Sequence, residues 1–134
     1  MSFSYYLESD NELIIDKELN IVWISSELNI LGTLSESRKY LTKFKFNELS
    51  DWKIPTKIEL ERLINFINSN KELSTQFFPD IKDWGYLTST IYYEKCNDEL
   101  NFNKEYIWIG NLDTKILRPA NKTHKFYLKP CRKL

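Results

Sequence analysis

The chain has 134 residues, of which 42% are hydrophobic and 28% are charged, and its formal net charge is zero. This composition is typical of a globular protein, and we predict a single domain over residues 1–134 that can bury a core without disulfide bonds. It excludes a membrane-spanning helix, because no apolar run approaches the roughly 18 residues that such a helix needs.

The charges are distributed unevenly along the chain. Seven acidic residues and one lysine lie between Met1 and Glu36, whereas seven basic residues and no acidic residue follow Asp113. Either the two ends neutralise each other in the fold, which we favour, or the basic end binds phosphate or sulfate groups. The first ten residues lack the basic and apolar regions of a secretion signal, which leaves the location open between the cytoplasm and a non-classical export route.

The first predicted element is a hairpin formed by residues 12–16 and 20–24, which are rich in Ile, Val and Trp. A helix should follow, because Thr33 and Glu36 have the spacing of a capping box. Four residues with helical spacing then extend this pattern to Phe44: Ser37, Tyr40, Leu41 and Phe44.

A second helix begins after Pro55, which ends the preceding segment. Thr56 and Glu59 form another capping box. An apolar stripe with helical period follows, made of Leu60, Leu63, Ile64 and Ile67. The polar residues 68–70 should end this helix.

Strands are predicted after Pro79, at residues 86–93, 105–110, 115–118 and 124–129, since these segments are β-branched or aromatic and turn residues separate them. The polar segment 96–103 is predicted to be a long exposed loop. The order of elements predicts an α+β fold with two helices packed on a small, mostly antiparallel sheet.

The segment from Trp52 to Leu60 reads Trp-Lys-Ile-Pro-Thr-Lys-Ile-Glu-Leu. It resembles the signature of the Lcl C-terminal domain family, a bacterial domain of largely unknown function found at the tip of collagen-like adhesins. The resemblance extends along nearly the whole chain. Its signature residues are Trp23, Trp52, Pro55, Thr56, Glu59, Ser89, Thr90 and Cys131.

The resemblance implies a reduced C-type-lectin-like fold, related to the formylglycine-generating enzymes, in which the N- and C-terminal strands are adjacent. Such an arrangement would place the acidic end beside the basic end. Two departures matter. Leu41 stands where many members have the cysteine that pairs with the closing strand, so Cys131 lacks that partner, and Leu87 replaces a tryptophan of the family's Ser-Thr strand.

We expect no enzymatic activity, no cofactor and no metal. His124 is the single histidine, and no motif places a base beside a nucleophile. Cys96 and Cys131 fit no zinc or redox spacing, so we expect two reduced thiols. The formylglycine-generating alternative, which we rank third, would require these two cysteines to be close and reactive. A calcium site at Asp98, Glu99 and either Asn97 or Asn101 is a weaker alternative, because the loop motifs of calcium-dependent lectins are missing.

Recognition of a glycan or a protein is the predicted function. The loop-rich face implied by the resemblance would use aromatic and Asn/Asp side chains, although we favour a core position for each of Trp84, Tyr86 and Tyr92. The candidate residues on this face are Trp84, Tyr92, Tyr93, Asn97, Asp98, Asn101 and Asn103.

A second candidate surface is basic and suits a sulfated polysaccharide. Its residues are Lys122, Lys125, Lys129 and Arg132. Strand alternation would send Lys125, Tyr127 and Lys129 to one exposed face. The alternative function is that of a subunit or delivered cargo of a larger protein assembly. Nucleic acid is a less favoured partner, because no helix is rich in Arg and Lys.

Overall fold

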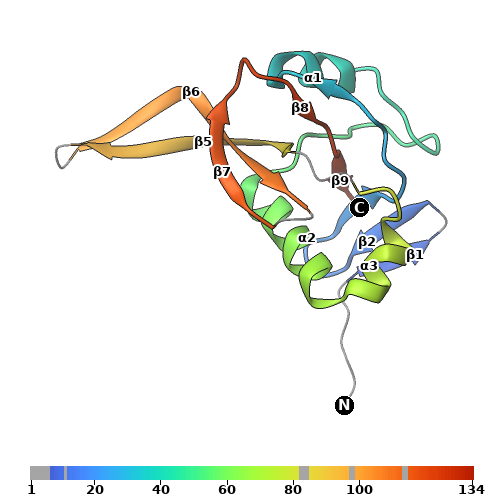
Figure 1. Cartoon of the computed structure of the whole chain (residues 1–134). Coiled ribbons are helices and arrows are strands. Elements are labelled where there is room, and N and C mark those ends of the chain that lie inside the picture. The colour runs from blue at the N-terminus through green and yellow to red at the C-terminus, as the bar shows by residue number, and fades with distance from the viewer. Residues whose placement is uncertain (1–6, 11, 82–84, 97–98, 113–114) are drawn as a thin grey trace.

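The computed structural model describes the whole chain except residues 1–6, 11, 82–84, 97–98 and 113–114, and it describes residues 7–10 and 93–105 by their backbone alone. It confirms the α+β class (Figure 1). The described part of the chain contains three helices and two sheets, where the sequence predicted two helices and one sheet. No helix in this part is both long and apolar enough to cross a membrane.

The first sheet joins the two ends of the chain. Its strand order is β1 (Leu7–Asp10), β2 (Leu13–Asp16), β3 (Ile21–Ile24) and β9 (Cys131–Lys133), and all neighbouring strands are antiparallel. The predicted hairpin is therefore confirmed as β2–β3. Because β9 pairs with β3, the basic end of the chain lies beside the acidic end, as the resemblance implied.

The second sheet carries the hairpin that projects from the body of the protein in Figure 1. Its strand order is β4 (Leu31–Gly32), β8 (Phe126–Tyr127), β5 (Gly85–Cys96), β6 (Glu99–Asn111) and β7 (Leu117–Asn121). Of the strand pairs described in this sheet, only β5 and β8 run parallel, paired at Tyr86 and Tyr127. The prediction of a long loop at residues 96–103 is wrong, because β5 continues to Cys96 and β6 begins at Glu99.

Both predicted capping boxes are present, at the starts of α1 (Leu34–Leu41) and α2 (Lys57–Ser69). Helix α1 ends three residues earlier than predicted, because the amide and hydroxyl of Thr42 both donate to the Lys39 carbonyl and close the last turn. Helix α3 (Lys71–Phe77) was not predicted. It has seven residues, of which only Ser74 is buried. Its sequence therefore has no apolar stripe from which a helix could be predicted.

Two clusters of buried side chains lie on either side of β3, which is buried along its whole length. Ile21 and Trp23 belong to the cluster that contains the apolar stripe of α2, whereas Val22 and Ile24 belong to the cluster that contains Leu34 of α1. A continuous apolar run is typical of a strand that is covered on both faces. Strand β3 therefore connects the two halves of the core.

Candidate functional site

The signature segment around Trp52 forms a junction between the two sheets and α2. The backbone of Lys53 bonds to Cys131 of β9 in both directions, at 2.7 and 3.0 Å. Two residues later, the Pro55 carbonyl accepts from the Ser89 amide of β5 at 2.9 Å. Thr90 of the same strand accepts from the first amide of α2, that of Lys57, at 2.8 Å.

Glu59 is the central side chain of this junction. Its carboxylate accepts from the Lys53 ammonium at 2.8 and 2.9 Å and from the Thr56 amide at 2.9 Å. Burial alone would raise the pKa of Glu59, but the hydrogen bonds from Lys53 and Thr56 outweigh burial and hold this pKa below its ordinary value. The signature thus encodes a structural connection, because the side chains of Thr56, Glu59 and Thr90 all bond to other groups of the junction.

Cys131 completes the junction. Its thiol is fully buried and unbridged, and Sγ lies 3.9 Å from Oε1 of Glu59. Burial and the nearby Glu59 carboxylate raise the pKa of this thiol far above its ordinary value. A thiol that stays protonated is a poor nucleophile, so this geometry is that of a structural cysteine. The other cysteine, Cys96, is the last residue of β5 and is the pairing partner of Glu99, the first residue of β6.

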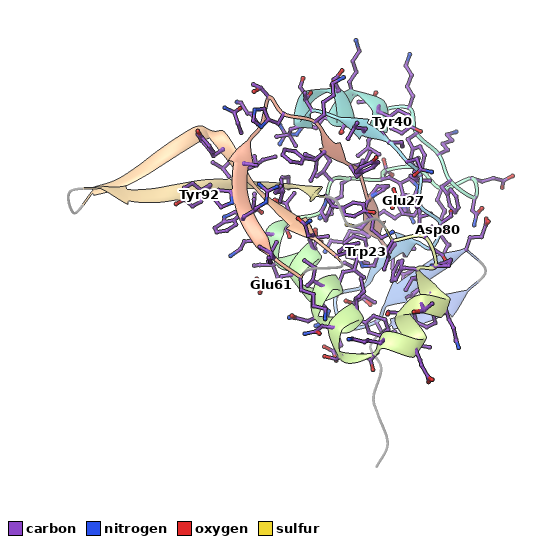
Figure 2. The ribbon with its side chains drawn as sticks, in the orientation of Figure 1. Trp23, Glu27, Tyr40, Glu61, Asp80 and Tyr92 are labelled. Atoms are coloured by element: carbon purple, nitrogen blue, oxygen red, sulfur yellow. The ribbon has the colours of Figure 1, made fainter. Side chains whose placement is uncertain are left out.

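The predicted loop-rich face is distributed differently in the fold. Tyr92 is half-buried on β5, and its ring meets the ring of Trp108 edge-on with centroids 5.4 Å apart. Figure 2 shows Tyr92 where the β5–β6 hairpin leaves the body. Tyr86 is a core residue with no exposed surface, and its hydroxyl donates to Glu27 at 2.6 Å.

The other candidates of this face lie partly or wholly beyond what the structure describes. Trp84, Asn97 and Asp98 lie outside the described residues, and Tyr93, Asn101 and Asn103 are placed on β5 and β6 by their backbone alone. The calcium site at residues 97–101, the alternative that the sequence did not favour, is therefore not tested. Among the side chains that are described, no three His, Cys, Asp or Glu residues gather as metal ligands.

Lys129 is wrongly predicted as a surface residue. It is 3% exposed, and its ammonium donates to the Ile24 carbonyl at 3.3 Å and lies 4.6 Å from the centre of the Phe78 ring. Strand β8 ends at Tyr127, so the alternation that predicted an exposed row does not reach Lys129. Burial lowers the pKa of Lys129 to about 8, although Glu27 favours the charged form.

The three other predicted basic residues remain at the surface but do not form one cluster. Lys122 lies in the turn after β7, and Lys125 is exposed near Glu36 of α1. The Thr33 amide and Lys125 together hold the pKa of Glu36 below its ordinary value. Arg132 lies elsewhere, on the Trp52 side of the molecule, where its Nε donates to the Ser50 carbonyl at 2.8 Å.

A groove beside α1 is lined by one of these residues, Lys122, and by two cations that the sequence analysis did not single out, Arg38 and Lys53. Its first part has a volume of about 550 Å³ and lies between the start of α1, the middle of β5 and β6, and the turn after β7. Its second part, of about 320 Å³, lies over Trp52 and Ile54. Arg38 lines both parts, so they adjoin, and we call them together the α1 groove.

The lining of the α1 groove combines an apolar floor with a cationic rim. Leu34, Ile91 and Ile107 form the floor of the first part, and the hydroxyl residues Thr33, Ser35 and Thr123 also line it. The described lining contains three cations, Arg38, Lys53 and Lys122, and no carboxylate. Lys53 is partly neutralised by Glu59, whereas Arg38 and Lys122 form no ion pair with any described carboxylate.

Sequence reasoning missed Arg38 and Lys53 because nothing local distinguishes them. Arg38 stands next to Lys39 in the last turn of α1, where basic residues are common because of the helix dipole. Lys53 stands inside the signature segment, between Trp52 and Pro55, so the resemblance drew attention to the segment and not to this side chain. These side chains meet Lys122 only in the folded chain, where segments far apart in the sequence line one groove.

The comparison with protein families agrees with the resemblance seen in the sequence. A family model described as Lcl C-terminal domain matches residues 12–132, which is nearly the whole chain. No curated protein matches the chain. The chain belongs to the Lcl C-terminal domain family.

Proposed function

We propose that this chain is a non-enzymatic recognition domain that binds an anionic glycan, a sulfated polysaccharide, in the α1 groove. The observation that carries the proposal is the composition of the groove: three cations and no carboxylate among the described lining residues. Sulfate groups would pair with Arg38 and Lys122, because a guanidinium and an ammonium are the usual partners of such groups. The apolar floor would contact the C–H faces of the sugar rings.

The test measures binding of a dextran sulfate oligosaccharide to the purified chain by calorimetry, with unsulfated dextran as the ligand control. Arg38→Gln should weaken binding by about tenfold, which corresponds to about 1.4 kcal/mol. Lys39→Gln is the matched control, because Lys39 is exposed in the same helical turn but does not line the groove. It should change the affinity by less than about twofold.

Salt supplies a second readout. Binding should weaken steeply as salt rises, and removing Lys122 should lower the slope of log affinity against log salt by about one unit. Equal losses for Arg38→Gln and Lys39→Gln would show that only net charge matters and would contradict binding in the groove. Absence of binding to the sulfated ligand would refute the proposal.

We also propose that the chain is not an enzyme, and the chemistry of its histidine and of its buried cysteine supports this. His124 is exposed, and Cys131, one of the two cysteines that the formylglycine-generating alternative would require to be reactive, is buried, which raises the pKa of its thiol. The alternative predicts fast labelling of Cys131 by a thiol reagent under native conditions. Labelling of Cys131 only after unfolding would support the non-enzymatic proposal.

A protein partner is the second candidate, and the surface at the edge of the second sheet favours it. Leu31 on β4 is 53% exposed. It borders a hollow of about 360 Å³ that Phe126 and Tyr127 also line. If the chain is a subunit of a larger assembly, it should oligomerise or co-purify with a partner, and Leu31→Asp should abolish that association. A monomer at all concentrations, with no co-purifying partner, would contradict this candidate.

A further inference from the structure

The face of the β5–β6 hairpin opposite the α1 groove has a second feature, which the groove does not use. Along β6, Ile107 and Ile109 point into the cluster that contains Leu34, whereas Gly110 faces α2, since a Cβ there would meet Leu60 at 2.8 Å and Ile64 at 3.1 Å. By alternation, Trp108 and Tyr106 lie on the α2 side with Gly110. The two sides of the same strands therefore have different surroundings.

Helix α2 covers only part of that side. Its first residue is Lys57, whose ammonium lies 4.3 Å from the centre of the Trp108 ring. Beyond this point, toward the tip of the hairpin, Tyr106 is 37% exposed and Tyr92 is half-buried against Trp108. Pro119 of β7 is the pairing partner of Trp108 and is exposed. We call Tyr92, Tyr106, Trp108, Pro119 and Lys57 the aromatic platform.

The ring geometry favours a ligand with a flat apolar face. Tyr92 meets Trp108 at an interplanar angle of 76°. Rings in direct edge contact leave no slot between them into which the ring of a proline could insert, which is how aromatic grooves bind proline-rich peptides. A contiguous row of partly exposed rings is a surface that a sugar ring can cover with its C–H face.

The positive charge of Lys57 at the border of the platform favours a sugar that carries a negative charge. Lys57 pairs with the Trp108 ring and forms no ion pair with a described carboxylate. A ligand that combines an apolar ring face with one negative charge at its edge complements both features, since the ring face would lie on the aromatic side chains and the charge would meet the ammonium.

We propose that the aromatic platform is a second glycan-binding site, distinct from the α1 groove, that takes a pyranose ring bearing a carboxylate, as in a hexuronate unit. The proposal shares with the proposed function only the view that the chain binds glycans. The sulfated ligand of the groove and the unsulfated ligand of the platform lie on opposite sides of the same two strands, so either site can fail without the other.

The experiment titrates the purified chain with an unsulfated tetrasaccharide of galacturonic acid and follows tryptophan fluorescence. A saturable change is expected, and it should disappear in Trp108→Phe, which assigns the signal. Lys57→Gln should weaken binding at least fivefold, and this conservative variant keeps the backbone contacts of α2. Tyr106→Ser should weaken binding at least fivefold as well.

Tyr40 provides the matched control. It is 45% exposed and lies on α1, away from the platform (Figure 2), so Tyr40→Ser should leave the affinity within twofold. Arg38→Gln should also leave the affinity for this ligand within twofold, which separates the platform from the groove. Near-ultraviolet circular dichroism checks that each variant is folded.

Four results would overturn the proposal. They are no fluorescence change with the tetrasaccharide, equal binding of a neutral tetrasaccharide of glucose, an unchanged affinity in Lys57→Gln, and binding of a proline-rich decapeptide in place of the sugar. The last result would identify the platform as a peptide site.

Discussion

Replacing Glu59 by alanine should destabilise the protein strongly, because one carboxylate serves three elements. It completes the capping box of α2, pairs with Lys53 in the segment before the helix, and lies against the Cys131 thiol of β9. The residue is 8% exposed. Loss of the cap acceptor, of a half-exposed ion pair and of buried side-chain volume together should lower the free energy of unfolding by about 3 kcal/mol.

Glu36 provides a matched control for this prediction. It forms the same capping box with Thr33 at the start of α1, but it is exposed and has no contact equivalent to that with Cys131. Urea denaturation at pH 7 should therefore show a much smaller loss for Glu36→Ala than for Glu59→Ala. Equal destabilisation by the two substitutions would mean that the capping box alone explains the contribution of Glu59 to stability. The signature would then not be a junction between sheets.

Three further substitutions test other parts of the structure. Ser37 has a buried hydroxyl with no hydrogen-bond partner among the described residues, so Ser37→Ala should raise the free energy of unfolding by about 1 kcal/mol in the same urea assay, and a loss would show that the hydroxyl is satisfied. Gly110→Ala should lower it by about 1–2 kcal/mol, because the added methyl group would meet Leu60 and Ile64 of α2. Lys129 has a pKa of about 8 in the fold and 10.5 when unfolded, so between these values the unfolded chain holds the additional proton and the contribution of Lys129 to stability rises with pH. The difference in unfolding free energy between the wild type and Lys129→Met should therefore shift in favour of the wild type from pH 8 to 10.5, and a difference that does not change with pH would show that the ammonium is solvated.

Local sequence patterns predicted the parts of the fold that local chemistry determines. The two Thr-x-x-Glu boxes predicted both helix starts, since the hydroxyl and carboxylate satisfy amides within one turn. The apolar run from Ile21 to Ile24 predicted a strand, because β-branched and aromatic residues favour strands and a short continuous apolar run is typical of a buried one. Helix α3 and the full length of the β5–β6 hairpin were missed, because α3 has almost no buried face and residues 96–103 are polar.

The candidate sites depended on contacts that no local pattern contains. Lys129 has the sequence context of a strand residue, yet the two-residue length of β8 and the return of the chain to β3 carry its side chain into the interior. Arg38 became a candidate only because α1 packs beside Ile91 and Ile107, which lie more than fifty residues further along the chain. Prediction of the α1 groove from sequence would have required the register of the second sheet.

The location of the sulfated ligand is the most direct test of the proposed function. Two-dimensional nuclear magnetic resonance of the isotope-labelled chain, titrated with a dextran sulfate oligosaccharide, reports the ligand contacts residue by residue. We expect the largest amide shifts at the start of α1, at Arg38, at Ile91 and Ile107, and at Lys122 and Thr123. Shifts confined to other surfaces, or no shifts at saturating ligand, would contradict binding in the α1 groove.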